Sequence, residues 1–85
     1  MSLDEYRKEI DEIDNQIIAF LNRRYQVVEK IKVEKEKTGQ TIHDPTREAA
    51  ALNRMAQALQ APFSLEMLKD IYSVIFASSR KIQKR

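Results

Sequence analysis

Apolar residues in the first third of the chain recur in alternating steps of three and four positions, the spacing of one face of an α-helix. No proline or glycine occurs before Gly39, so the pattern predicts one uninterrupted helix over residues 3–37. The positions on this face, which we call the apolar stripe, are Leu3, Tyr6, Ile10, Ile13, Ile17, Phe20, Val27 and Ile31.

The length of this helix indicates a partner chain. About 35 residues in a helix span about 50 Å, whereas a compact chain of 85 residues has a radius of gyration of about 12 Å. Such a helix extends beyond any compact monomer and leaves its stripe exposed. We therefore expect a second chain to cover it, most simply an identical one related by a two-fold axis.

Clear signals mark the end of the first helix and the start of the second. Gly39 follows a lysine-rich segment, and cations followed by glycine are typical of a helix C-terminus. After a loop over residues 39–44, Asp44 and Pro45 suit the N-cap and the first helical position. The second helix is therefore expected over residues 45–60.

A third helix is expected after a break at residues 61–63. Ser64 suits its N-cap, and apolar positions at helical spacing continue towards the end of the chain. We place this helix over residues 64–83. The prediction is an all-α chain of three helices with a long first helix, forming a single domain over residues 1–85.

The composition excludes several kinds of chemistry. Apolar residues make up 42% and charged residues 33% of the chain, with one glycine and two prolines, as is typical of an all-helical domain. There is no cysteine, which excludes disulfides and thiol chemistry. His43 is the single histidine and is interpreted as a loop residue, so no metal site is expected.

Charge and hydropathy narrow the choice of partners. The net charge is +2, with acids and bases interspersed, which does not favour a nucleic acid despite the basic C-terminal segment. No apolar run approaches membrane-spanning length, and no signal-peptide core precedes the first helix. We therefore expect a cytoplasmic protein that does not bind membranes.

The apolar stripe of the first helix is interrupted by cations. Arg24 occupies the stripe position between Phe20 and Val27. Lys35, eleven residues later, returns to within about 20° of the same direction. A buried charge without a partner is costly, so each cation needs an anion. These long side chains either reach solvent or pair within the bundle, or they line a binding pocket.

The other two helices also carry polar residues on their apolar faces. Glu48 precedes Leu52 by one turn, Ser79 follows Ile75 by one turn, and Gln83 follows Ser79 by another. Taken singly, these are an acid near a helix N-terminus, a small residue tolerated in a core and a solvated terminal residue. Taken together with the two cations, they suggest the alternative of one polar pocket in apolar surroundings, the usual form of a small-molecule site.

The chemistry of this set suits an anionic small molecule. Arginine forms bidentate bonds to carboxylates, and lysine supplies a compact charge. No nucleophile paired with a base is apparent, so covalent catalysis is unsupported. Positioning and preorganised electrostatics can nevertheless accelerate a unimolecular rearrangement without chemical participation by the protein.

An ordered set of segments runs through nearly the whole chain. It comprises residues 3–14, Leu21-Asn22-Arg23-Arg24, Lys35, Asp44-Pro45-Thr46-Arg47-Glu48, Ser79 and Gln83. The set closely resembles the all-helical AroQ class of chorismate mutases, and residues 6–14 look like the family's opening pattern L-R-x-x-I-x-x-I-D, with Tyr6 at the position of the leucine. The resemblance implies an intertwined homodimer whose long first helices cross between protomers. It also implies the cofactor-free rearrangement of chorismate to prephenate in Phe and Tyr biosynthesis.

The resemblance further implies a catalytic or binding role for individual residues. Arg24 and Arg7 would bind the two substrate carboxylates, with Arg7 reaching in from the partner chain. Lys35 would contact a carboxylate and the ether oxygen, and Gln83 would donate to that same oxygen. Helix geometry agrees about Arg7, which lies about 100° around and roughly 25 Å along the helix from Arg24, too far for one small ligand.

The remaining roles concern the ring hydroxyl and one carboxylate. By the same resemblance, Glu48 would accept a hydrogen bond from the ring hydroxyl, helped by the backbone amide of Asp44. Ser79 would assist a carboxylate, and Arg47 would orient Glu48. No metal or cofactor is expected.

Two other functions stay open. The related isochorismate–pyruvate lyases share the fold and several charged positions, and a helical dimerisation or regulatory module would need no catalysis. The family also includes domains fused to other enzymes of the shikimate pathway. The chain is therefore expected to act alone or as a domain fused to, or associated with, such an enzyme.

Overall fold

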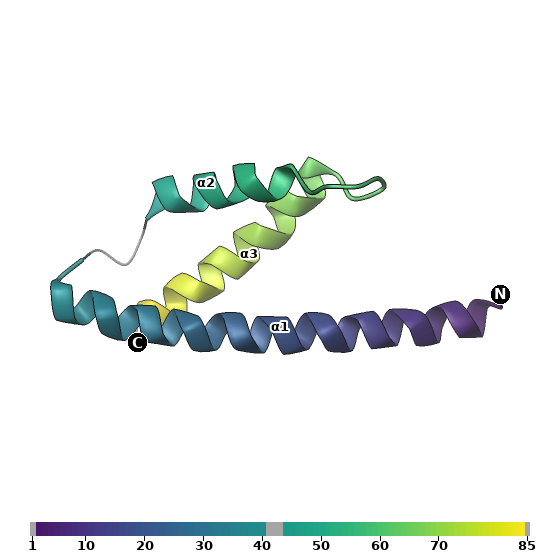
Figure 1. Ribbon diagram of the computed structural model, residues 1–85, viewed down its shortest axis with the longest axis horizontal. Coiled ribbons are helices and arrows are strands. Elements are labelled where there is room, and N and C mark those ends of the chain that lie inside the picture. The colour runs from purple at the N-terminus through teal and green to yellow at the C-terminus, as the bar shows by residue number, and fades with distance from the viewer. Residues whose placement is uncertain (1, 41–43, 85) are drawn as a thin grey trace.

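The computed structural model describes residues 2–40 and 44–84, which form three α-helices (Figure 1). α1 covers Leu3–Thr38, α2 covers Pro45–Ala56 and α3 covers Leu65–Lys84. The chain is elongated, with extents of 54 × 23 × 16 Å and a radius of gyration of 16.0 Å. The predicted all-α fold with a long first helix is confirmed. Within the described ranges, no helix combines the length and the apolar character needed to span a membrane.

Both ends of α1 are capped. The side chain of Ser2 accepts a hydrogen bond from the backbone amide of Glu5, which satisfies one of the free donors of the first turn. At the other end Gly39 adopts the left-handed conformation, with φ of 71°, and its amide donates to the carbonyl of Lys35. The predicted end of the first helix is confirmed to within one residue. The expected loop position of His43 lies outside the described residues.

α2 begins where predicted but ends early. The side chain of Asp44 caps it by accepting from the amide of Arg47 at 3.0 Å. The helix ends at Ala56, so the predicted end at Gln60 was wrong. Beyond Ala56, three successive backbone amides bond carbonyls three residues back, a tighter winding than that of an α-helix. Pro62 disfavours helical backbone at the residue before it, and the chain leaves the helix in the turns that lead to it.

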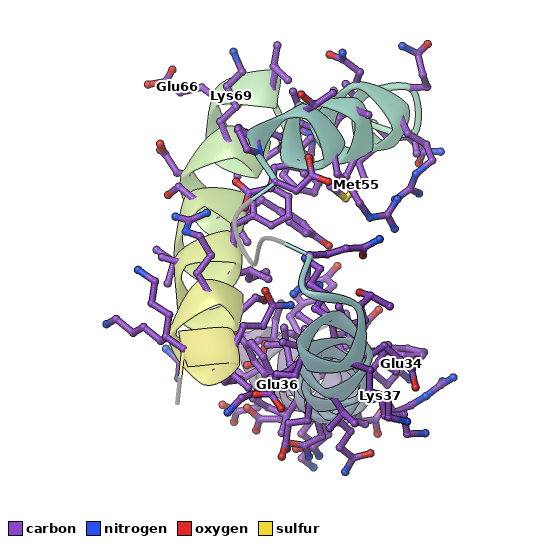
Figure 2. The ribbon with its side chains drawn as sticks, turned by 90° about the vertical axis from the view of Figure 1, so that its left-hand side faces the viewer. Glu34, Glu36, Lys37, Met55, Glu66 and Lys69 are labelled. Carbon is purple, nitrogen blue, oxygen red and sulfur yellow. The ribbon has the colours of Figure 1, made fainter. Side chains whose placement is uncertain are left out.

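α3 joins the other two helices. It packs against both α1 and α2, which lie apart when the molecule is seen along α1 (Figure 2). Its predicted N-cap is confirmed, because the side chain of Ser64 accepts from the amide of Met67 at 3.2 Å. The buried apolar side chains of the described residues are Val28 of α1 with Leu68 and Phe76 of α3. The single chain therefore has only a small core.

The apolar stripe of α1 is uncovered along its whole length. Its exposed fractions run from 38% at Ile31 to 63% at Leu3. The shielded residues of α1 are centred about 50° around the helix from the centre of the stripe at 3.6 residues per turn, and Arg24 and Lys35 are the members of this group nearest the stripe. The shielded residues are Leu21, Arg24, Tyr25, Val28, Lys32 and Lys35. The predicted exposure of the stripe in a single chain is confirmed.

Candidate active site

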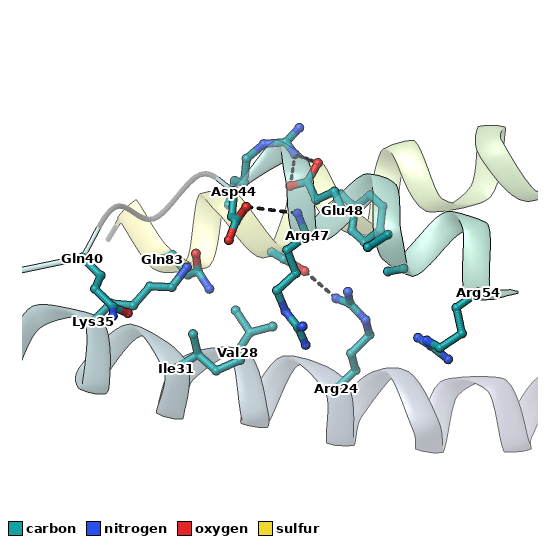
Figure 3. Close-up of a pocket in the computed structure, with 15 residues that line it drawn as sticks. Arg24, Val28, Ile31, Lys35, Gln40, Asp44, Arg47, Glu48, Arg54 and Gln83 are labelled. Atoms are coloured by element: carbon teal, nitrogen blue, oxygen red, sulfur yellow. Dashed lines mark hydrogen bonds and ion pairs between the residues drawn. The ribbon is translucent and has the colours of Figure 1, made fainter. Parts of the chain in front are cut away.

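A cavity of about 650 Å³ lies between the second half of α1, α2 and the end of α3 (Figure 3). This volume is in the range of small-molecule sites. Its apolar walls include Val28, Ile31 and Phe76. The polar residues that line it are Arg24, Lys35, Gln40, Asp44, Arg47, Glu48, Arg54, Ser79, Arg80 and Gln83.

The cavity brings together seven of the eight residues singled out from the sequence. They are Arg24, Lys35, Asp44, Arg47, Glu48, Ser79 and Gln83. The eighth, Arg7, is exposed on the N-terminal part of α1, which extends away from the other helices (Figure 1). The predicted convergence of polar residues from three helices on one pocket is confirmed, while the role of each residue stays a prediction.

Arg24 is held in place by α3. Its Nη1 donates a hydrogen bond to Oγ of Ser79 at 2.6 Å. Its guanidinium carbon lies 5.7 Å from the ring centre of Phe76 and 6.0 Å from that of Tyr72. Aromatic faces at this range stabilise a cation. The cation that interrupts the apolar stripe is therefore anchored at the cavity wall, and its other N–H groups remain for a ligand.

Ser79 orients Arg24. Its hydroxyl donates to the carbonyl of Ile75, one turn earlier, at 2.9 Å. The hydroxyl oxygen therefore presents its lone pairs to Arg24 and accepts the bond described above. Ser79 is buried, with 9% of its surface exposed. In this arrangement its hydrogen is committed to the backbone, so any effect of Ser79 on a ligand would pass through Arg24.

Glu48 pairs with Arg80. Nη1 of Arg80 donates to both carboxylate oxygens of Glu48, at 2.9 and 2.7 Å. The resemblance had assigned the orienting role to Arg47 instead. The backbone amide of Arg47 binds the cap residue Asp44, and its side chain extends from α2 towards α1 (Figure 3). The role expected for Arg47 therefore stays a prediction. The ion pair between Arg80 and Glu48 was not indicated by the sequence.

Lys35 and Gln83 lie at the end of the cavity formed by the last turns of α1 and α3. Both line the cavity, and their side chains point towards the same part of it (Figure 3). Gln83 is buried, with 8% of its surface exposed. Lys35, a cationic donor, and Gln83, a neutral donor, thus lie at the same end of the cavity (Figure 3). Their positions on the apolar faces of two helices had suggested that they share a pocket.

Three further polar residues of the cavity were not predicted from the sequence, namely Gln40, Arg54 and Arg80. Arg54 could have been found, because it follows Arg47 by two helical turns and therefore lies on the same face of α2. Arg80 directly follows Ser79 on α3, but its partner is on another helix. No spacing within one helix signals such a pair, which depends on how α2 and α3 pack.

The cavity carries an excess of positive charge. Its acids are Asp44 and Glu48, whereas its cations are Arg24, Lys35, Arg47, Arg54 and Arg80. A cationic cleft attracts anions, and its guanidinium groups are suited to carboxylates. Among the described residues no cluster of acids and histidines could hold a metal ion. Fold and site together define a three-helix protein with a site for an anionic small molecule.

Comparison with known proteins identifies the family. The family model described as chorismate mutase type II matches residues 6–84, so the chain belongs to this family. The bifunctional chorismate mutase/prephenate dehydratase of Aquifex aeolicus is 32% identical over 87 residues, covering 98% of this chain and 24% of that protein. The T-protein of Haemophilus influenzae is 31% identical over 71 residues, covering 82% of this chain and 19% of that protein. The chain thus spans a quarter or less of these relatives.

A solved structure matches nearly the whole chain. It is the crystal structure of chorismate mutase from Helicobacter pylori in complex with prephenate. The TM-score is 0.88 and the sequence identity 33%, with 96% of this chain and 89% of that chain covered. The arrangement of the three helices is therefore that of a chorismate mutase chain.

Proposed function

We propose that the chain catalyses the rearrangement of chorismate to prephenate, a step of Phe and Tyr biosynthesis. The observation that carries this proposal is the convergence of Arg24, Lys35, Glu48 and Gln83 on one cationic cavity. Chorismate carries two carboxylates, an ether oxygen and a ring hydroxyl, and these residues are suited to each of them. The likeness to a chain solved with prephenate supports the same substrate class.

The reaction needs no group transfer from the protein. One C–O bond of chorismate breaks and one C–C bond forms within the same molecule, with no net exchange of protons or electrons. Negative charge builds on the ether oxygen as the C–O bond breaks. Lys35 and Gln83 donate hydrogen bonds to that oxygen, and donors aimed at developing charge lower the barrier. The protein contributes position and electrostatics, without a cofactor.

The other residues hold the substrate in its reactive conformation. Arg24, fixed by Ser79 and two aromatic rings, binds one carboxylate. Glu48 accepts a hydrogen bond from the ring hydroxyl, beside the backbone amide of Asp44. Arg47 lies next to them on α2 and supports this end of the site.

The second carboxylate requires Arg7, and Arg7 requires a second chain. In a homodimer with crossed first helices, the exposed stripe of each α1 is covered by the partner. The N-terminal part of one α1 then reaches the cavity of the other protomer and brings Arg7 to it. The exposure of the whole stripe in the single chain supports this assembly. The expected cytoplasmic location and any fusion to another enzyme stay predictions.

The test is a direct assay. The purified chain is incubated with chorismate, and prephenate is followed by chromatography, with isochorismate tested in parallel. We expect prephenate from chorismate. If a folded chain forms no prephenate, the proposal is contradicted, and release of pyruvate from isochorismate would instead indicate a lyase.

A further inference from the structure

The ion pair between Arg80 and Glu48 ties α3 to α2 at the cavity wall. One guanidinium nitrogen, Nη1, donates to both carboxylate oxygens, at 2.9 and 2.7 Å. The side chains are only 30% and 26% exposed, and both residues line the cavity. The pair is thus partly withdrawn from solvent at the place where a ligand would bind.

Successive residues of α3 serve opposite walls of the cavity. Ser79 bonds Arg24 on α1 at 2.6 Å, and Arg80 binds Glu48 on α2. Neighbouring helical residues point about 100° apart, so one turn of α3 reaches both walls. This turn of α3 therefore helps to fix the distance between Arg24 and Glu48 across the cavity.

The ion pair leaves Glu48 able to accept a further hydrogen bond. A carboxylate offers about four acceptor positions on its two oxygens. Nη1 of Arg80 uses one position on each oxygen, so positions remain for a hydroxyl. Arg80 also offsets the negative charge of Glu48, which would otherwise repel the carboxylates of an approaching dianion.

We propose that Arg80 is a positioning residue that holds the Glu48 carboxylate where it accepts from the ring hydroxyl of the substrate. This inference rests on the proposed function. Arg80 acts through Glu48 and does not itself contact the reacting atoms. An exposed ion pair on the outer surface would contribute little to stability and nothing to turnover. Because this pair lies at the cavity instead, it can affect turnover by positioning Glu48.

The experiment is a double-mutant cycle. Arg80→Gln, Glu48→Ala and the double variant are compared with the wild type, with kcat, KM and Tm measured for each. Neighbouring coupled residues commonly show interaction effects of about 2- to 100-fold. We expect Arg80→Gln to lower kcat/KM by about 10-fold in the wild type and by less than about 2-fold in the Glu48→Ala background. Without the carboxylate there is nothing left to position.

Two further variants separate positioning from a general effect on the fold. Arg80→Lys keeps the charge but has a different donor geometry, so it should recover only part of the loss. Lys81→Gln removes an exposed cation from the adjacent position of α3 and should leave kcat/KM unchanged. A lower Tm with unchanged kcat/KM for Arg80→Gln would show that the pair is purely structural and would overturn the inference. Equal losses in both backgrounds would also overturn it, because Arg80 would then act independently of Glu48.

A binding measurement separates this inference from the proposed function. Prephenate keeps the ring hydroxyl, so the same four proteins are titrated with prephenate by calorimetry. If the wild type binds prephenate but does not convert chorismate, the proposed function fails. The coupling between Arg80 and Glu48 in the affinity for prephenate then still decides whether Arg80 positions Glu48. If the wild type neither binds prephenate nor converts chorismate, the proposed function and the inference both fail. Conversion of chorismate without coupling between Arg80 and Glu48 overturns the inference alone.

Discussion

Residues 3–20 and residues 21–35 of α1 carry the same alternation of apolar and polar positions, but only the second segment packs in part against the rest of the chain. Every described residue of the first segment is exposed. In the second segment Val28 is buried, and Arg24 and Lys35 line the cavity. The two halves of the helix therefore differ, because the second half lines the cavity with α2 and α3 while the first half is exposed among the described residues.

The arginines of the two segments show what this difference means for function. Arg24 is fixed by a hydroxyl and two aromatic rings, which hold it at the cavity. Arg7 is exposed, far along the helix from that cavity. A preorganised cation needs packed neighbours, and in the proposed homodimer the partner chain would supply them to Arg7. The half that packs within the chain thus holds its arginine at the cavity, whereas the role proposed for Arg7 depends on dimer assembly.

The largest effect is expected in the packed half. Arg24→Ala or Lys35→Ala should lower kcat/KM for chorismate by at least about 10²-fold, because each removes a charged donor from the site. Circular dichroism should show the helical content unchanged. Lys30→Ala, an exposed cation of the same helix, is the control and should keep full activity. A folded Arg24→Ala protein with near wild-type turnover would refute the assignment.

A change at the end of the cavity should make activity depend on pH. A neutral amide at Gln83 donates at any ordinary pH, whereas the carboxyl of Gln83→Glu donates only when protonated, with a reference pKa of about 4.3. We expect a loss of about 10-fold or more at neutral pH and recovery as the pH falls through that pKa. A pH–rate profile equal to that of the wild type would show that Gln83 does not contact the breaking bond.

In residues 3–20 of α1, the exposed half, a single introduced charge should weaken the proposed homodimer without changing the cavity. Ile13 lies on the apolar stripe and is 44% exposed in the single chain. Ile13→Asp would bury a carboxylate at the dimer interface, which is costly. We expect the concentration at which half of the protein is dimeric to rise by about 10-fold or more in sedimentation experiments. Asn15→Asp, on the opposite face of α1, should leave the dimer intact. Equal behaviour of the two variants would argue against the stripe as the interface.

A mixture of variants from both halves should restore part of the activity. If Arg7 serves the partner's site, a heterodimer of Arg7→Ala and Lys35→Ala chains has one site with both changes and one intact site. Random exchange makes about half of the dimers heterodimers, so about a quarter of the wild-type sites should return. The two inactive proteins are unfolded together, refolded and assayed, with each refolded alone as the control. Complete subunit exchange without recovery would place Arg7 in its own chain's site or in none.

Several features followed from the sequence because they depend on neighbours within one helix. Gly39, Asp44 and Ser64 mark helix ends through local backbone rules, and each end or cap agrees with the structure. The alternation of three and four positions identified the stripe. The polar residues on apolar faces, such as Arg24 and Glu48, indicated the candidate site, because a charge on such a face is costly to bury without a partner.

The features that the sequence did not determine depend on how helices lie against one another. Periodicity placed Val27 on the apolar face, but α3 packs about 50° around α1 from the centre of the stripe and buries Val28 instead. The pairing of Arg80 with Glu48 likewise exists only because α3 brings its last turns to the start of α2. Helical spacing fixes directions within one element, whereas the rotation and crossing of two elements follow from the packing of all their side chains. Sequence alone therefore identified most residues of the site, and tertiary structure decided which of them hold one another in place.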